Sequence, residues 1–383
     1  MEKENQFDYI ICGGGASGLM LAHKLSEDPF FNRKQILIVE RDSNKTNDRT
    51  WCFWEEKESD LEAIIHKRWK KAVFKSTEYS KEINLNPFQY KMIRGIDFYS
   101  KITNELTKKK NITFVNDKIK SIDDQGGIVA VVCEEKIYSG SKVFSSIPDK
   151  EYLNSTTKFP VLNQHFIGWF VKTEQAIFDP KTIQFMDFDL PQKGNTRFMY
   201  VLPFSETEAL VEYTLFSKDL LKNEEYEAEI KTYLNKKKAG NFSITEREQG
   251  GIPMTAYPFW EKNSTNVMRI GTAGGWTKAS TGFTFQKTVR KTKEVVEFLK
   301  EEKPLNAMNQ KNRFWFYDLL FIDVLSKHNE KGHHLFSLMF KKNKSENIFR
   351  FLDEQTSFFQ EFKIMLSFPV GLFVRALWKR IFN

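Results

Sequence analysis

Three glycines and one acid near the start of the chain have the types and spacing needed to hold a phosphate group. Gly13, Gly15 and Gly18 follow the pattern G-x-G-x-x-G directly after an apolar run, and Glu40 follows a second apolar run. Such glycines permit a tight turn, a close approach of backbone to a pyrophosphate, and close packing of a helix on a strand. The next helix would offer free N–H groups to the phosphates, and the acid would take the ribose hydroxyls. The pattern therefore predicts a dinucleotide site at Gly13, Gly15, Ala16, Gly18 and Glu40.

One carboxyl group in the middle of the chain is the candidate for moving a proton. Glu212 lies in ALVEYTLF, an apolar strand in which it shares a face with Leu210, Thr214 and Phe216. Burial among apolar side chains raises the pKa of a carboxyl group, and this keeps a general acid protonated near neutral pH. The alternative is a solvated glutamate on the outer face of an edge strand, because glutamates are mostly exposed.

Two further stretches combine glycines or aromatic rings in ways that suit a binding site. GTAGG, from Gly271 to Gly275, follows a short strand and precedes a long helix. The polar stretch NDRT leads into Trp51, Phe53 and Trp54, and polar groups beside aromatic rings are typical of a pocket with one apolar wall. A plain glycine turn and a surface loop pinned by aromatic packing are the structural alternatives.

The elements that would hold these residues divide the chain into four parts. Short strands, helices and meander strands occupy residues 1–150, and a further strand, glycine loop and helix occupy residues 261–300. Residues 151–260 contain strands with alternating aromatic residues, which predicts an antiparallel sheet with one buried face. Residues 301–383 are mostly helical and very rich in phenylalanine, which predicts a helical cap.

Composition excludes several classes of function. The net charge of +8 is spread over most of the chain without a nucleic-acid-binding motif, so we expect no nucleic acid partner. The histidines and the cysteines Cys12, Cys52 and Cys133 have no metal-ligand spacing, so we expect no metal. The cysteines form no disulfide framework either, which favours a reducing cytoplasm. No apolar run of eighteen residues is present, so we expect no membrane-spanning helix.

The motifs GGGASG, NDRTWCFW, QHFIGW, ALVEYTLFS, GGIPMT and GTAGGWTKASTGFTF occur in this order, and together they resemble the bacterial lycopene cyclases. The resemblance extends from about Phe7 to the FRFLDEQT segment near Phe349, which is nearly the whole chain. It implies an α/β fold with a Rossmann-type FAD-binding domain, similar to geranylgeranyl reductases and hydroxybenzoate hydroxylases. Residues 1–150 and 261–300 would form that domain, beside an antiparallel-sheet substrate domain and a helical C-terminal cap.

The resemblance also implies a reaction, that of a lycopene β-cyclase. Each acyclic end of lycopene would close into a β-ionone ring, through γ-carotene to β-carotene, without net oxidation or reduction. The implied cofactor is FAD in its reduced form, with NAD(P)H as the reductant. Glu212 matches the family's functional glutamate and would handle the proton. A negatively charged reduced flavin would stabilise the cationic intermediate in a dry site, where Coulomb interactions are strong.

The remaining site residues follow from the same resemblance. Aromatic faces attract a carbocation by roughly 0.5–2 kcal/mol each, although simple core packing is the alternative for every such ring. Many relatives in the wider fold carry an aspartate where this chain has Thr272, and this departure weakens the expected contact to the ribityl chain. Arg49 matches the family's DRT and is expected to line the flavin or the pocket. The second flavin motif would comprise Gly271, Thr272, Gly274, Gly275, Thr281 and Gly282, and the pocket walls Trp51, Phe53, Trp54 and Phe166.

The C-terminal stretch PVGLFVRALWKRIFN suits delivery of a substrate dissolved in a membrane. Val370, Val374 and Trp378 belong to one apolar helical stripe, and Arg375 and Lys379 lie away from it. The helix would be about 20 Å long, which is shorter than the hydrocarbon core of about 30 Å. We therefore expect peripheral contact with the cytoplasmic face of the membrane. A terminal helix packed on the domain is the alternative.

Two other functions fit the same residues. The chain could be an FAD-dependent oxidoreductase that acts on an isoprenoid lipid, such as a prenyl reductase, an epoxidase or a desaturase. It could also be a non-catalytic flavin- or carotenoid-binding protein at a membrane surface, although Glu212 on an apolar face argues for catalysis.

Overall fold

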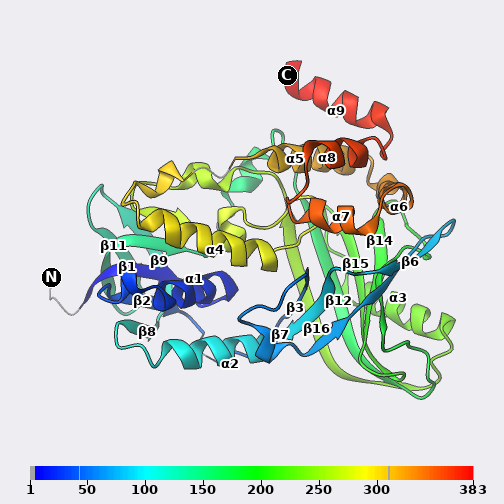
Figure 1. Ribbon diagram of the computed structural model, residues 1–383, viewed down its shortest axis with the longest axis horizontal. Coiled ribbons are helices and arrows are strands. Elements are labelled where there is room, and N and C mark those ends of the chain that lie inside the picture. Colours follow the sequence, from blue (N-terminus) through cyan, green and yellow to red (C-terminus); the bar gives the residue numbers. More distant parts are fainter. Residues whose placement is uncertain (1–4, 43, 309–310, 383) are drawn as a thin grey trace.

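The computed structural model describes residues 5–42, 44–308 and 311–382. A nucleotide-binding half and a large second sheet stand side by side, and helices of the C-terminal part lie over the second sheet (Figure 1). The two halves are not consecutive in the sequence, because the chain crosses between them several times.

The first sheet has the strand order β8-β2-β1-β11-β10-β9, with β17 also paired to β11. Its central strands are parallel, and β9 and β10 add an antiparallel meander. Strands β1 and β2 are short apolar runs buried on both faces, as parallel strands usually are. The strands are β1 (Gln6–Cys12), β2 (Ile36–Glu40), β8 (Ile112–Asn116), β9 (Ile119–Asp124), β10 (Val129–Cys133), β11 (Ile137–Ser145) and β17 (Val267–Arg269).

Helices cover one face of this sheet and the meander covers the other. α1 (Ala16–Glu27) contacts both α2 (Gly95–Leu106) and α4 (Phe285–Leu299), and all three share one apolar core with β1 and β2. Side chains of β10 pack with Ile10 and Leu37 on the opposite face. This arrangement brings the N-termini of α1 and α4 to the same edge of the sheet.

The second sheet has the order β16-β12-β15-β14-β13-β5-β6 and is antiparallel except where β13 runs parallel to β5. The expectation of one buried face was wrong, because β12, β14 and β15 are buried on both faces. α3 (Asn223–Lys236) packs its Tyr226 and Ile230 against the outer face and excludes water there. The strands are β5 (Lys71–Lys75), β6 (Ser80–Asn84), β12 (Leu162–Thr173), β13 (Thr182–Asp187), β14 (Thr196–Pro203), β15 (Glu208–Ser217) and β16 (Phe242–Met254).

The division at residue 150 does not match the sheets. Strands β5 and β6 come from the first part of the chain, yet they complete the second sheet, because β5 pairs with β13. A small sheet in the order β3-β7-β4 connects the two halves, with bounds Thr50–Glu55, Gln89–Arg94 and Lys67–Trp69 respectively. Short 3-10 turns lie at Pro29–Phe31, Glu62–Ile64, Glu151–Ser155, Phe259–Lys262, Gly271–Gly274, Leu305–Ala307 and Asn329–Lys331.

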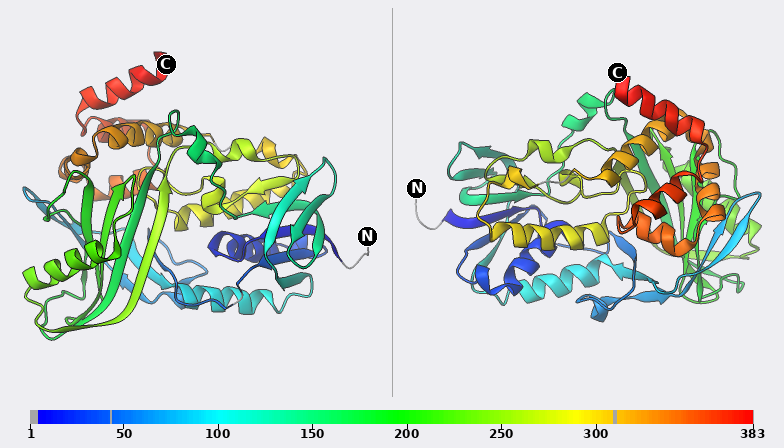
Figure 2. Two further views of the ribbon diagram at one scale, coloured as in Figure 1. Left: turned by 180° about the vertical axis from the view of Figure 1, so that it is seen from behind. Right: turned by 45° about the horizontal axis from the view of Figure 1, so that its top comes forward.

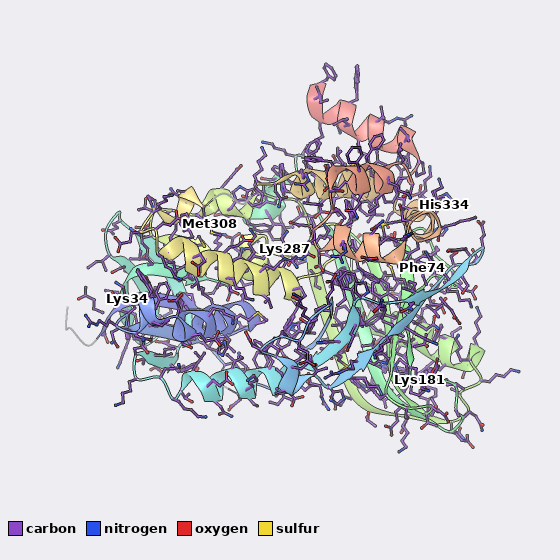
Figure 3. All side chains as sticks on the ribbon, viewed as in Figure 1. Lys34, Phe74, Lys181, Lys287, Met308 and His334 are labelled. Carbon is purple, nitrogen blue, oxygen red and sulfur yellow. The ribbon has the colours of Figure 1, made fainter. Side chains whose placement is uncertain are left out.

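The C-terminal part is helical, as the sequence predicts. Its helices are α5 (Arg313–Lys327), α6 (Gly332–Lys342), α7 (Ser345–Leu352), α8 (Phe358–Met365) and α9 (Val370–Phe382). Phenylalanines from these helices fill the inner face of the second sheet, and Phe340 of α6 stacks on Phe74 of β5 with ring centroids 4.5 Å apart. Figure 3 labels Phe74 beside the helices of the C-terminal part. α9 contacts α5 and projects beyond the other helices (Figures 1 and 2). Within the described ranges, no helix is both long enough and apolar enough to cross a bilayer.

Candidate functional site

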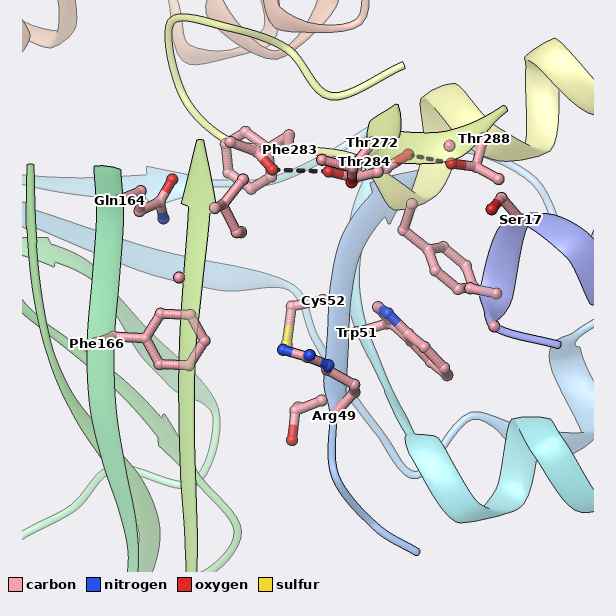
Figure 4. A pocket seen from close by; sticks show the side chains of 18 of the residues that line it. Ser17, Arg49, Trp51, Cys52, Gln164, Phe166, Thr272, Phe283, Thr284 and Thr288 are labelled. Carbon is pink, nitrogen blue, oxygen red and sulfur yellow. Dashed lines mark hydrogen bonds between the residues drawn. The ribbon is translucent and has the colours of Figure 1, made fainter. Parts of the chain in front are cut away.

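A cavity of about 890 Å³ lies between the two halves and contains most of the residues that the sequence singled out. One end is lined by α1 and the glycine loops, and the other by the inner face of the second sheet and by Phe336 and Met339 of α6. Figure 4 shows Ser17 of α1 on one side, Phe166 and Gln164 of β12 on the other, and Trp51 between them.

The first glycine motif forms a tight turn at the nucleotide end of the cavity. Gly13 has φ +106°, and a side chain there would collide with the Ser146 hydroxyl group. Gly15 and Ala16 line the cavity, and α1 begins there without a side-chain cap and without an acid in its first turn. Its first N–H groups and its positive dipole end are therefore available to an anion.

Gly18 and Glu40 complete this end in different ways. Gly18 lies behind the turn, where an added Cβ would collide with the carbonyl oxygen of Gly13. Its role is close packing of helix on strand. Glu40 lines the cavity; its carboxylate accepts a 2.7 Å hydrogen bond from the Gly14 amide and lies 3.1 Å from the Lys45 ammonium. The acid is thus fixed at the edge of the cavity, beside the turn.

The second glycine motif approaches the same end from the other side. Gly271, with φ +61°, packs against Ser17 of α1, and Gly271, Thr272, Thr281 and Gly282 all line the cavity. The motif leads into α4, whose N-terminus also has no side-chain cap and no acid in its first turn. Two helix N-termini therefore point toward one cavity.

Gly274 and Gly275 do not line the large cavity. A Cβ on Gly274 would collide with the Arg269 carbonyl group, and Gly275 adopts the left-handed conformation at φ +73°. These two residues shape the turn that brings Gly271 and Thr272 to the cavity. Gly274 and Gly275 therefore support the expected cofactor site through the shape of the turn and do not themselves line the cavity.

Two buried polar atoms lie where the second glycine motif meets β12. The Thr281 hydroxyl group and the side-chain amide oxygen of Gln164, next to Gly282, have no hydrogen-bond partner among the described residues. Buried polar groups are normally paired. The unpaired atoms and the two open helix N-termini together match a ligand that carries both phosphates and polar ring atoms.

The aromatic residues expected as walls separate into two pairs. Trp51 and Phe166 line the cavity, and Phe166 lies against Gly250 of the neighbouring strand. Phe53 stacks on Phe285 with centroids 4.8 Å apart, and Trp54 donates its indole N–H to Asp353 of the cap at 2.6 Å. Both are buried in the core and do not line the large cavity. Core packing, the alternative for each ring, therefore describes Phe53 and Trp54.

Glu212 lies on the inner face of β15 and lines the cavity with Leu210 and Phe216. Only 8% of Glu212 is exposed, so the solvated alternative is excluded. The Thr214 hydroxyl group donates a hydrogen bond to its carboxylate. Burial and the nearby Glu248 carboxylate raise the pKa of Glu212 above its usual range, and the bond from Thr214 opposes this shift.

The sequence analysis missed Glu248. This residue also lines the cavity and is 8% exposed, and burial raises the pKa of its carboxyl group as well. The signal was obscured because Glu248 lies in the charged run TEREQ on the edge strand β16, where charges are usually solvated. Side chains two or four positions apart in a strand share a face, so Glu248 lies on the same face as Ile252, which lines the cavity. This alternation along β16 could have predicted that Glu248 faces inward.

Arg49 lies between these carboxylates and the nucleotide end. It lines the cavity with half of its side chain exposed, and its charge opposes the rise in the pKa of Glu248. Beyond the carboxylates the cavity is apolar. That end is lined by Phe198, Phe216, Phe336, Met339, Phe340 and Leu352.

Solved structures with the same fold are flavoproteins and related enzymes. A geranylgeranyl bacteriochlorophyll reductase-like protein from Thermoplasma acidophilum matches with a TM-score of 0.59 and 13% identity, over 94% of this chain and 96% of that one. A flavoprotein/dehydrogenase from Cytophaga hutchinsonii matches with a TM-score of 0.58 and 13% identity, over 91% and 92%. The flavin-dependent brominase Bmp2 matches with a TM-score of 0.54 and 12% identity, over 98% and 99%. These matches confirm the Rossmann-type α/β fold of FAD-dependent oxidoreductases.

Comparison of the sequence itself gives a more specific result. No curated protein matches the chain significantly. The family model described as lycopene cyclase protein matches residues 8–377, which is nearly the whole chain. The chain therefore belongs to the lycopene cyclase family.

Proposed function

We propose that this protein is a lycopene β-cyclase that closes the acyclic ends of lycopene into β-ionone rings. The observation that carries the proposal is the position of Glu212. Its carboxyl group is buried on the inner face of β15, between the nucleotide end and the apolar end of one continuous cavity. A carboxyl group kept neutral in such a place can protonate an alkene, which is the first step of ring closure.

FAD is the cofactor that the fold and the family support. Gly13, Gly15 and the N-terminus of α1 would hold its pyrophosphate, and Glu40 its ribose. The loop from Thr281 to Gly282 and the N-terminus of α4 would face the flavin ring. In its reduced, negatively charged form the flavin would supply a charge that stabilises a nearby carbocation. NAD(P)H would serve as the reductant that keeps it in this form.

Side chains of the protein would deliver the proton, stabilise the cation and exclude water. Glu212 delivers the proton to the terminal double bond, the neighbouring alkene then closes the ring, and a proton leaves beside the second cation. Phe166 lies on the adjacent strand with its ring in the cavity, where an aromatic face stabilises positive charge. The apolar side chains that line the far end of the cavity, among them Phe198 and Leu352, exclude water, which would otherwise trap the cation as an alcohol.

The substrate would arrive from a membrane through the cap. α8 and α9 carry exposed apolar side chains, and Phe359 is 89% exposed and Trp378 64%. α9 also packs on α5, where Arg380 binds Asp323 at 2.6 Å. One side of this helix is thus packed on the cap and the other side is exposed. We infer peripheral contact with the cytoplasmic face of the membrane, with the exposed side turned to lipid.

Expression in a lycopene-accumulating bacterial host tests the proposal. We expect the pigment to change from lycopene to γ-carotene and β-carotene when the chain is present. The matched variant Glu212→Gln keeps the size of the side chain and removes the acidic proton, so we expect it to bind flavin normally and to form no rings. Unchanged lycopene with the wild-type chain, or β-carotene formation by the variant, would contradict the proposal.

A second candidate is an oxidoreductase on an isoprenoid lipid, which the reductase and dehydrogenase among the structural neighbours favour. The two functions differ in reductant use. A reductase consumes one NAD(P)H for each double bond that it reduces, and an epoxidase one for each epoxide, whereas a cyclase needs only enough to reduce the flavin. Measuring NADPH oxidation against product formed separates them.

A further inference from the structure

Two buried carboxylates lie on one transverse row of the second sheet. Gly168 of β12 pairs with Glu212 of β15 on one side and with Glu248 of β16 on the other. Because residues at the same level of a sheet present their side chains to the same face, Glu212 and Glu248 both point into the cavity. Both line it, and Tyr200 of β14 continues the row beyond Glu212.

The missing side chain of Gly168 determines where the Glu248 carboxylate lies. A Cβ placed on Gly168 would be 3.1 Å from Glu248 Cγ and 3.4 Å from its Oε1. The Glu248 side chain therefore crosses over Gly168 in the direction of Glu212. Strands are about 4.8 Å apart, so two side chains that converge across one glycine can reach the same small substrate group.

The surroundings of the two carboxylates differ in a way that separates their roles. Glu248 accepts a 2.6 Å hydrogen bond from the Thr50 hydroxyl group, and Arg49 is close enough to favour its charged form. Burial first, and then the nearby charge of Glu248, raise the pKa of Glu212 and favour its neutral form. Two neighbouring carboxyl groups whose environments differ in this manner can act as one acid and one base.

We propose that Glu248 is the base that takes up the proton released when the ring closes, with Glu212 as the donor. The inference rests on the cyclase function proposed above. Glu212 gives its proton to the terminal alkene carbon, a carbon–carbon bond closes the ring, and the cation moves to the adjacent carbon. Glu248 then removes a proton next to that carbon, and the electron pair of the broken C–H bond forms the ring double bond. One proton has moved from Glu212 to Glu248, and no electron is gained or lost.

The position of the base then determines the ring isomer. Loss of the proton from the carbon that has just formed the ring bond gives a β ring, and loss from the ring CH₂ on the other side of the cation gives an ε ring. Glu248 on β16 would reach only one of these protons. Ring type is therefore a readout that a merely structural role of Glu248 would not change.

The test compares Glu248→Gln with the matched control Glu208→Gln in the full-length holoenzyme with reduced flavin, using lycopene in vesicles. Glu208 is the first residue of β15 in the same sheet, but it pairs with Lys172 at 3.1 Å and does not line the cavity. We expect Glu248→Gln to lower β-ring formation about 100-fold, in the range of a lost general base. The remaining products should contain ε rings or hydroxylated rings. Glu208→Gln should give β rings at the wild-type rate.

A second variant keeps the inference testable if Glu248→Gln does not fold. Thr50→Val removes the hydrogen bond that favours ionised Glu248, so the loss of activity at low pH should begin at a higher pH than in the wild type. The other groups facing Glu248 that carry or could carry charge are Arg49, Cys52, Glu212 and Glu246, and all remain in this variant.

The outcomes distinguish the two proposals. A wild-type chain that forms no rings overturns the cyclase function and this inference together. A wild-type chain that forms β rings, with Glu248→Gln equal to it in rate and ring type, overturns this inference alone. If the loss of activity at low pH begins at the same pH in Thr50→Val as in the wild type, the inference is overturned as well.

Discussion

The Thr214 hydroxyl group donates a hydrogen bond to the carboxylate of Glu212, two residues earlier in the same strand. This bond stabilises the charged form of the carboxyl group and therefore lowers the pKa that burial raises. Thr214 is itself fully buried.

The first prediction concerns the pH dependence of turnover. Because Glu212 must be protonated to act as an acid, activity should fall as the pH rises through its raised pKa. Thr214→Val removes a donor that favours ionisation, so the pKa should rise further and the alkaline limb should move to higher pH. Turnover measured between pH 6 and pH 10 checks this (about the range where a raised carboxyl pKa lies). A limb that moves to lower pH would contradict the assignment.

The second prediction is that two glycines of the first motif have different roles: Gly18 allows the helix to pack closely on the strand, and Gly15 allows the cofactor to approach the backbone. Within the described residues, a Cβ on Gly15 would meet nothing within 4 Å, whereas a Cβ on Gly18 would collide with the backbone of Gly13. Gly15→Ala should keep the melting temperature and lose flavin affinity, because only the cofactor needs that space. Gly18→Ala should lower both.

Flavin content after purification and thermal unfolding of the flavin-free protein measure the two effects. Gly127→Ala, in an exposed turn where an added Cβ meets nothing within 4 Å, is the matched control. If Gly15→Ala retains full flavin affinity, the cofactor does not approach this turn.

The third prediction concerns a buried ion pair that fastens the second glycine motif to the cap. Lys278 is 2% exposed, and its ammonium group lies 3.1 Å from the carboxylate of Asp318 in α5. Lys278→Met leaves the buried Asp318 without its cation and should lower the free energy of unfolding by about 3–5 kcal/mol. The double variant Lys278→Met/Asp318→Leu should recover most of this loss. Urea unfolding measures both, and equal stability of the single and double variants would contradict the prediction.

The fourth prediction concerns the exposed apolar residues of α8 and α9. Trp378 and Ile381 are 64% and 63% exposed, and inserting one such side chain into lipid is worth roughly 1.5–3 kcal/mol. Trp378→Ser/Ile381→Ser should therefore weaken binding to vesicles at least tenfold, as should Phe359→Ser/Phe362→Ser. Co-sedimentation with phosphatidylglycerol vesicles measures this.

The control for membrane binding is Leu220→Ser. Leu220 is 65% exposed but lies between β15 and α3, on a different part of the molecule. Removal of residues 370–383 should weaken binding further than the paired substitutions on α9 alone. Undiminished binding after that truncation would mean that α9 does not contact lipid.

The nucleotide half was predictable because its signals are local. A strand, a G-x-G-x-x-G turn, a helix and an acid follow one another within residues 6–40, and each has its own sequence pattern. Glu212 was identified by its apolar strand together with the family resemblance, and only the structure excludes the solvated alternative. Trp51 and Phe166 were placed correctly at the cavity by resemblance.

The features that the sequence did not reveal depend on distant partners. Trp51 and Phe53 lie on the same face of β3 and both contact Phe285 of α4, more than two hundred residues away, yet only Trp51 lines the cavity. Glu248 lies on an edge strand, and the partner of its carboxylate is the Thr50 hydroxyl group of β3, 198 residues away in the sequence. Helix α3 buries the outer face of the second sheet in the same long-range manner.

The crossing of the chain between the two sheets has a consequence for synthesis on the ribosome. The hairpin of β5 and β6 has no sheet to join until β13 has emerged, and the first sheet gains β17 only after the whole of β16. The first sheet therefore cannot be completed until every strand of the second sheet has emerged, although domains usually fold one after another from the N-terminus. The nascent chain must leave the first sheet incomplete until residue 269 is free, so its dependence on chaperones should be set by topology more than by final stability.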